Sequence, residues 1–165
     1  MAKPKNQSES ASKPKKIRIL FVCTGNTCRS AMAESIFKAE IKRRGLGGRF
    51  AVSSAGLSVN PGDEMNPAAR AALTELGYRP HKHKSRPLTL AKAASSDLIV
   101  CMTAAHKALI NLENAYTVGE ITGGGDVSDP FGLPAEEYVR AARYIAYSAD
   151  EVLALAENLG AHNKK

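Results

Sequence analysis

Two residues with complementary chemistry, Cys23 and Arg29, lie close together in the string Val-Cys-Thr-Gly-Asn-Thr-Cys-Arg-Ser at residues 22–30. A thiolate is a nucleophile, and the planar guanidinium of an arginine matches two oxygens of a phosphoryl group. The hydroxyl of Ser30, next to the arginine, could donate to the sulfur and stabilise the thiolate. The spacing therefore predicts attack on phosphorus, in which Cys23 is the nucleophile and Arg29 binds the phosphoryl oxygens and the transition state.

A strand and a helix must position this string. An apolar run at 17–22 predicts a buried parallel strand, and residues 31–44 predict a helix that Ser30 could cap. Gly25 and Asn26 tolerate positive φ, so successive N–H groups of the loop can turn inward beside the positive end of the helix. The loop is thus a predicted oxyanion cradle. Its expected substrate-binding residues are Thr24, Gly25, Thr27 and Cys28.

The rest of the sequence alternates strands with helices. Such alternation predicts an α/β fold: a single-domain, four-stranded parallel sheet with helices on both faces, which is a Rossmann-like architecture. Ligands of such sheets bind at the carboxyl ends of the strands, where Cys23 lies. The expected strands are 17–22, 50–54, 97–102 and 115–118, the expected helices are 31–44, 67–76, 88–95, 103–112 and 134–159, and a long loop is expected at 119–133.

Composition excludes several classes of function. The chain has 165 residues, 44% of them apolar, and a net charge of +7. Residues 1–16 hold five of the lysines and little to bury, so we expect a disordered basic tail there. No apolar run approaches the ~20 residues that span a bilayer, and no basic helix with interleaved aromatics indicates a nucleic-acid partner. Three cysteines, an odd number, do not suggest a disulfide framework, which favours a reducing, cytoplasmic setting.

The fuller string Cys-x-Gly-Asn-x-Cys-Arg-Ser, between a strand and a helix, resembles the active-site loop of the low-molecular-weight protein tyrosine phosphatase family. The resemblance extends over nearly the whole chain from Ile17 and implies a phosphatase domain at 17–162, a cysteinyl-phosphate intermediate, and no cofactor or metal. It also implies that Asp129, in an Asp-Pro-Phe-Gly string, is the general acid of the first step and the base of the second. Phe131 would wall the pocket entrance.

The resemblance implies supporting roles for four further residues. Asn26 would hold the loop in its strained shape, and Ser54 matches a family serine that hydrogen-bonds to that asparagine. His83 matches a histidine in the same network. Cys28 would trap an oxidised Cys23 as a reversible disulfide, which predicts redox regulation; alternatively, Cys28 simply packs in the loop.

Thr27 bears on the substrate. The tyrosine-directed members usually carry a larger aliphatic residue at this position, whereas threonine resembles the bacterial protein-arginine phosphatase branch. A small polar side chain leaves room and a hydroxyl for the guanidinium of phosphoarginine. The alternative is an ordinary low-molecular-weight protein tyrosine phosphatase that tolerates Thr27.

One departure from the family is Ala31, which replaces a proline at the start of the helix.

Rival functions lack their required residues. An arsenate reductase needs relay cysteines, which residues 78–95 do not contain, and Cys23 and Cys28 lack a second pair of zinc ligands nearby in sequence. A non-enzymatic phosphoprotein-binding module could dispense with Cys23 or Asp129, and both are present. We therefore expect a monomeric enzyme whose partners are phosphorylated proteins, and the arginine branch implies a role in a bacterial stress response.

Overall fold

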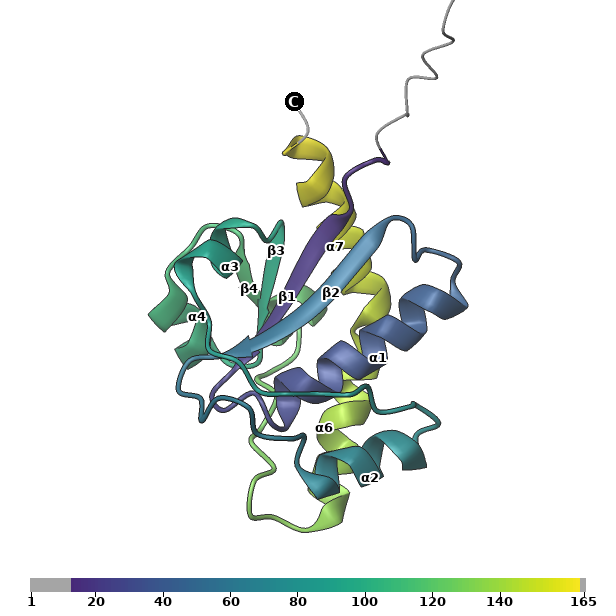
Figure 1. Ribbon diagram of the computed structural model, residues 1–165, viewed down its shortest axis with the longest axis vertical. Coiled ribbons are helices and arrows are strands. Elements are labelled where there is room, and N and C mark those ends of the chain that lie inside the picture. The colour runs from purple at the N-terminus through teal and green to yellow at the C-terminus, as the bar shows by residue number, and fades with distance from the viewer. Residues whose placement is uncertain (1–12, 164–165) are drawn as a thin grey trace, which may run out of the picture.

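A parallel sheet in the strand order β2-β1-β3-β4 forms the centre of the molecule (Figure 1). The computed structural model describes residues 13–163, so most of the predicted tail, residues 1–12, lies outside the described residues. Adjacent strands keep a continuous register, in which Phe21 of β1 pairs with Ser54 of β2 and Val100 of β3. The strands are β1 (Ile17–Cys23), β2 (Phe50–Gly56), β3 (Leu98–Cys101) and β4 (Ala115–Thr117).

Helices cover both faces of the sheet, as predicted. Side chains alternate along β1, so Ile19 and Phe21 enter one apolar core while Leu20 and Val22 enter another. The first core lies against α1, α2, α6 and α7, and the second lies against α3 and α4. This two-sided burial explains the continuous apolar run of β1. The helices are α1 (Arg29–Arg43), α2 (Pro67–Glu75), α3 (Leu90–Ala94), α4 (Ala104–Ile110), α5 (Val118–Thr122), α6 (Ala135–Tyr147) and α7 (Ala149–His162).

Two expected elements differ in the structure. The single helix predicted at 134–159 is two helices, α6 and α7, which meet at Ser148. The Ser148 hydroxyl donates to the Ile145 carbonyl at 2.6 Å, and such side-chain bonds compete with the helical ladder. The loop predicted at 119–133 also begins with a helix, α5, because Thr117 and Glu120 form a capping box.

Gly56, at the end of β2, allows the sheet to approach the loop that follows β1. A Cβ at this position would lie 2.5 Å from the Thr24 carbonyl oxygen, so a side chain would collide with the backbone. Beyond it, the Leu57 and Ser58 N–H groups donate to the carbonyls of Cys23 and Thr24, each at 3.0 Å. The loop is therefore supported from β2 as well as from its own flanking elements.

The two ends of the described chain lie together where the strands begin, at the end of the sheet opposite that loop (Figure 1). Gly160 of α7 packs so closely on Ile17, the first residue of β1, that a Cβ would lie 2.7 Å from Ile17 Cγ1. None of the helices between residues 13 and 163 combines the length and apolar character that crossing a bilayer requires.

Candidate active site

The loop at residues 24–28 joins the carboxyl end of β1 to the first turn of α1. The predicted cap at Ser30 is wrong, because the helix begins earlier, at Arg29, with Cys28 as its N-cap. Ser30 instead lies within the first turn, and its hydroxyl is 2.8 Å from the Cys23 sulfur. Both side chains are buried. The serine is therefore placed to hydrogen-bond the nucleophile predicted from the sequence.

Asn26 holds the loop through both ends of its side chain. Its backbone adopts φ = 58°, the left-handed region that asparagine tolerates better than most residues. The side-chain amide donates to Ser30 Oγ at 2.8 Å and to Ser54 Oγ at 3.0 Å, and its carbonyl accepts from the Arg86 N–H at 3.0 Å. His83 Nε2 donates to the Asn26 main-chain carbonyl at 2.6 Å. The contacts predicted for Ser54 and His83 are thus present.

Arg29 and Asp129 face each other across the same site. Arg29 is buried, and its Nη1 donates to the Val127 carbonyl at 3.0 Å while Nη2 lies 3.6 Å from Asp129 Oδ2. The Asp129 side chain is 57% exposed, and its Oδ1 accepts from the Phe131 N–H at 3.1 Å. The guanidinium is therefore fixed from behind by the Val127 carbonyl, whereas the exposed carboxylate is held by its own loop and by its ion pair with Arg29.

A cavity of about 230 Å³ brings the predicted residues together. The loop forms its floor, and Phe131, 70% exposed, stands at its rim. Its volume suits a phosphoryl group and the first atoms of a side chain. The lining residues are Cys23, Thr24, Gly25, Thr27, Cys28, Arg29, Asp129 and Phe131.

The other two cysteines are free and buried. Burial raises the pKa of the Cys28 thiol, and the Thr27 hydroxyl lies 3.8 Å from its sulfur. Burial also raises the pKa of Cys101, in β3, to about 12. Both groups are therefore protonated near neutral pH, and Cys101, as expected, belongs to the core.

Two residues at the site were not predicted from the sequence. His106 of α4 is buried and its Nε2 lies 2.9 Å from the Thr24 hydroxyl. Burial and the nearby Arg29 charge lower the pKa of His106, so the ring is neutral at pH 7. Glu34 of α1 accepts from Ser54 Oγ at 2.8 Å and so lies behind the Asn26 network. Neither residue belongs to a recognisable motif, because its partners are distant in sequence.

A comparison with protein families identifies the family of this chain. The family model described as "Low molecular weight phosphotyrosine protein phosphatase" matches residues 18–164. The chain belongs to this family. The family prediction is confirmed, and the chain is a cysteine-dependent protein phosphatase.

Relatives in this phosphatase family carry two kinds of name. A "Protein-arginine-phosphatase" of Bacillus subtilis (strain 168) is 42% identical over 128 residues, which are 73% of this chain and 83% of the relative. A "Low molecular weight protein-tyrosine-phosphatase" of Streptomyces coelicolor is 33% identical over 128 residues, which are 69% of this chain and 77% of the relative. The chain is thus similar to members named for either substrate.

Solved structures of the family confirm the predicted fold of this phosphatase. A mutant of YwlE from Bacillus subtilis superposes with a TM-score of 0.78 at 37% identity, covering 88% of this chain and 99% of that chain. A YwlE arginine phosphatase mutant with a phosphorylated active-site serine gives a TM-score of 0.77 at 37% identity, covering 87% of this chain and 96% of that chain.

Proposed function

We propose that this phosphatase hydrolyses phosphoarginine on proteins through a cysteinyl-phosphate intermediate. The observation that carries the proposal is the single cavity lined by Cys23, Arg29 and Asp129, with Thr27 beside them. The phosphorylated active-site serine of the related YwlE mutant supports a phosphoenzyme intermediate. The phosphatase domain would span residues 17–162.

In the first step, the phosphoryl oxygens bind the N–H groups of the loop and the guanidinium of Arg29. The Cys23 thiolate attacks phosphorus while Ser30 hydrogen-bonds the sulfur. The S–P bond forms, the P–N bond breaks, and Asp129 gives its proton to the leaving nitrogen. The products are cysteinyl-phosphate and an unmodified arginine side chain.

In the second step, the Asp129 carboxylate takes a proton from a water molecule, whose oxygen attacks phosphorus. The S–P bond breaks, phosphate leaves, and the Cys23 thiolate is restored. Arg29 and the loop amides would balance the charge of the phosphoryl group through both steps. Asn26 keeps that loop in position through its bonds to Ser30, Ser54 and Arg86.

Arginine specificity is proposed on two grounds. Thr27 lines the cavity, and its hydroxyl makes only a long contact of 3.8 Å with Cys28, so it has capacity to bind a guanidinium. The relative at 42% identity is named a protein-arginine-phosphatase. The second candidate function is hydrolysis of phosphotyrosine, which the relatives named tyrosine phosphatases favour.

Thr27→Ile is expected to reverse the substrate preference. The branched aliphatic side chain would fill the space of the guanidinium and pack on an aromatic ring. Wild type should release phosphate faster from a phosphoarginine peptide than from a phosphotyrosine peptide, and the variant should favour phosphotyrosine, with a change of about 10–200-fold in the ratio of kcat/KM values.

A matched control is Thr74→Ile, since Thr74 is exposed on α2 outside the cavity. This change should leave the ratio of the two kcat/KM values unaltered. Preference for phosphotyrosine in wild type and in Thr27→Ile alike would preserve the chemistry of Cys23 and contradict arginine specificity.

Redox regulation is a further part of the proposal. Cys28 lies in the same cavity wall as Cys23, and its thiol could condense with a sulfenic acid on Cys23 to give a disulfide and water. Cys28→Ser should therefore lose most of the thiol-reversible recovery of activity after peroxide treatment. Recovery equal to that of wild type would show that Cys28 is only a packing residue.

The proposal extends to the cellular setting. Three free cysteines favour a reducing, cytoplasmic compartment. Phosphorylated proteins would be the partners of a monomer, and a place in the arginine branch would imply a role in a bacterial stress response. Size-exclusion chromatography of the purified chain tests the oligomeric state.

A further inference from the structure

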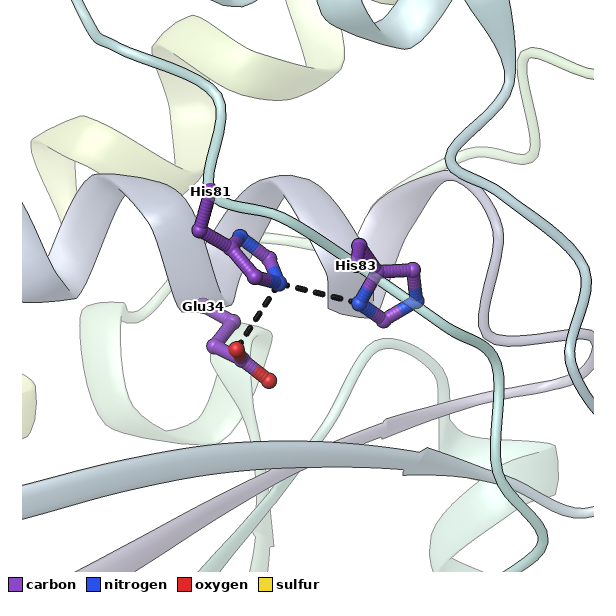
Figure 2. Close-up of side chains that lie close together, drawn as sticks. All are labelled: Glu34, His81 and His83. Carbon is purple, nitrogen blue, oxygen red and sulfur yellow. Dashed lines mark hydrogen bonds and ion pairs between the residues drawn. The ribbon is translucent and has the colours of Figure 1, made fainter.

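Three side chains outside the cavity direct nitrogen and oxygen atoms at one point (Figure 2). Glu34 comes from α1, and His81 and His83 come from the segment between α2 and α3. His81 Nε2 lies 2.8 Å from Glu34 Oε2 and 2.9 Å from His83 Nδ1. One potential ligand atom from each residue lies within 4.8 Å of the other two.

The hydrogen bonds around the cluster show which of these atoms carry lone pairs. His83 Nε2 must carry a hydrogen, because its partner is the carbonyl oxygen of Asn26, which can only accept. A neutral His83 therefore presents a lone pair on Nδ1. His81 Nε2 then carries the one hydrogen that lies between two acceptors, His83 Nδ1 and Glu34 Oε2. Three ligand atoms thus converge on the position of a single shared proton.

We propose that a divalent cation of the zinc type binds here in place of that proton, with Glu34 Oε2, His81 Nε2 and His83 Nδ1 as ligands. The His81 ring hydrogen then moves from Nε2 to Nδ1, where Ser35 Oγ can accept it. Two imidazoles and a carboxylate are a ligand set that Zn²⁺ takes in proteins, with water in the fourth position. Zn–N and Zn–O distances of about 2.0–2.2 Å place tetrahedral ligand atoms about 3.3 Å apart. The two pairs that include His81 Nε2 need to separate by only about 0.5 Å to reach that spacing, and the ligand atoms of Glu34 and His83 lie within 4.8 Å of each other.

In each of the three residues, the polar atom that would not bind the ion already has a hydrogen-bond partner. His83 Nε2 donates to the Asn26 carbonyl, His81 Nδ1 lies 2.5 Å from Ser35 Oγ, and Glu34 Oε1 accepts from Ser54 Oγ. Metal-binding histidines and carboxylates have such partners, which fix the orientation of each ring and carboxylate. The site is thus oriented before the ion arrives.

Lys38 competes with the ion. Its Nζ lies 2.7 Å from Glu34 Oε2, the same oxygen that would bind the metal. The Lys38 side chain is 48% exposed, so it can turn into solvent when a cation replaces it. The 12% exposure of the His81 side chain gives access for the ion and for a water ligand.

A cation at this site would act on the active-site loop from behind. Two of its ligands contact the Asn26 network, His83 directly and Glu34 through Ser54. Binding would cross-link α1 to the 81–83 segment and thereby reduce the freedom of the Asn26 main chain. The proposal concerns a metal site alone and is independent of which phosphorylated substrate the enzyme takes.

The test is calorimetric titration of the full chain with Zn²⁺, in a Cys23→Ser/Cys28→Ser parent that lacks the loop thiols. We expect one site in the parent. His81→Gln in this parent should weaken binding by at least about tenfold and should lose the rise in Tm that Zn²⁺ produces. His162→Gln, which removes an exposed histidine of α7, should bind as the parent does.

Lys38→Met gives a second variant that leaves all three ligands and their buried partners in place. It should bind Zn²⁺ more tightly than the parent, because the competing ammonium is gone. The proposal is overturned if the parent binds no Zn²⁺, if His81→Gln binds as tightly as the parent, or if Lys38→Met shows no gain in affinity.

Discussion

Cys23→Ser is expected to lower turnover by at least about 10⁴-fold, because the proposed reaction begins with attack by a thiolate. A serine hydroxyl at this position stays protonated near neutral pH, and Ser30 would then hydrogen-bond a neutral oxygen instead of a sulfur anion. The measurement is phosphate release under single-turnover conditions with phosphoarginine and phosphotyrosine peptides. The loss should appear with both substrates, since each requires the same attack of the Cys23 thiolate on phosphorus.

Binding of inorganic phosphate is the control for Cys23→Ser. Arg29 and the loop amides remain, so the variant should bind phosphate with an affinity close to that of wild type. Turnover within tenfold of wild type would contradict the assignment of the nucleophile. A wild-type chain that binds phosphopeptides without releasing phosphate would instead favour the binding-module alternative.

Asp129→Asn is expected to lower kcat by about 10²–10⁴-fold, the usual contribution of a general acid and base. An amide cannot give a proton to the leaving nitrogen or take one from water. Because the change also removes a negative charge 3.6 Å from Arg29, substrate binding should not weaken, and KM should stay level or fall. Steady-state kinetics that separate kcat from KM test both parts of this result.

Asp126→Asn is the matched control for Asp129. Asp126 lies in the same loop and accepts from the Ala104 N–H through a carboxylate oxygen, which an asparagine can also supply. This variant should retain kcat. A fall in kcat of equal size in both variants would mean that the loop, and not the Asp129 carboxyl group, is responsible.

The sequence predicted those parts of the molecule that depend on short stretches of chain. The apolar run of β1 identified a strand with both faces covered, and the eight-residue string from Cys23 to Ser30 placed a nucleophile at its carboxyl end. The hydrophobic pattern gave a wrong helix boundary where a side-chain hydrogen bond interrupts the helix. The apolar periodicity from 134 to 159 continued through Ser148, whose side-chain bond ends one helix and allows the next to begin.

Contacts between distant residues could not be obtained in this way. The resemblance indicated Ser54 and His83 as partners of Asn26, but the contact from the Arg86 main chain has no side-chain signal at all. Glu34 and His81 are 47 residues apart and meet only because α1 and the 81–83 segment pack together. The expectation of no metal rested on the family resemblance and on the cysteines, and it did not consider this pair.

The close packing of Gly160 on Ile17 determines which side of this enzyme faces a surface or protein to which it is attached. Parallel strands place all their carboxyl ends on one side, and β1 alone separates its first residue from Cys23 by roughly 20 Å. A surface, a reporter or a partner protein joined after residue 163 therefore attaches on the side away from the mouth that Phe131 borders. Immobilised enzyme would present its cavity outward, where phosphorylated proteins can reach it.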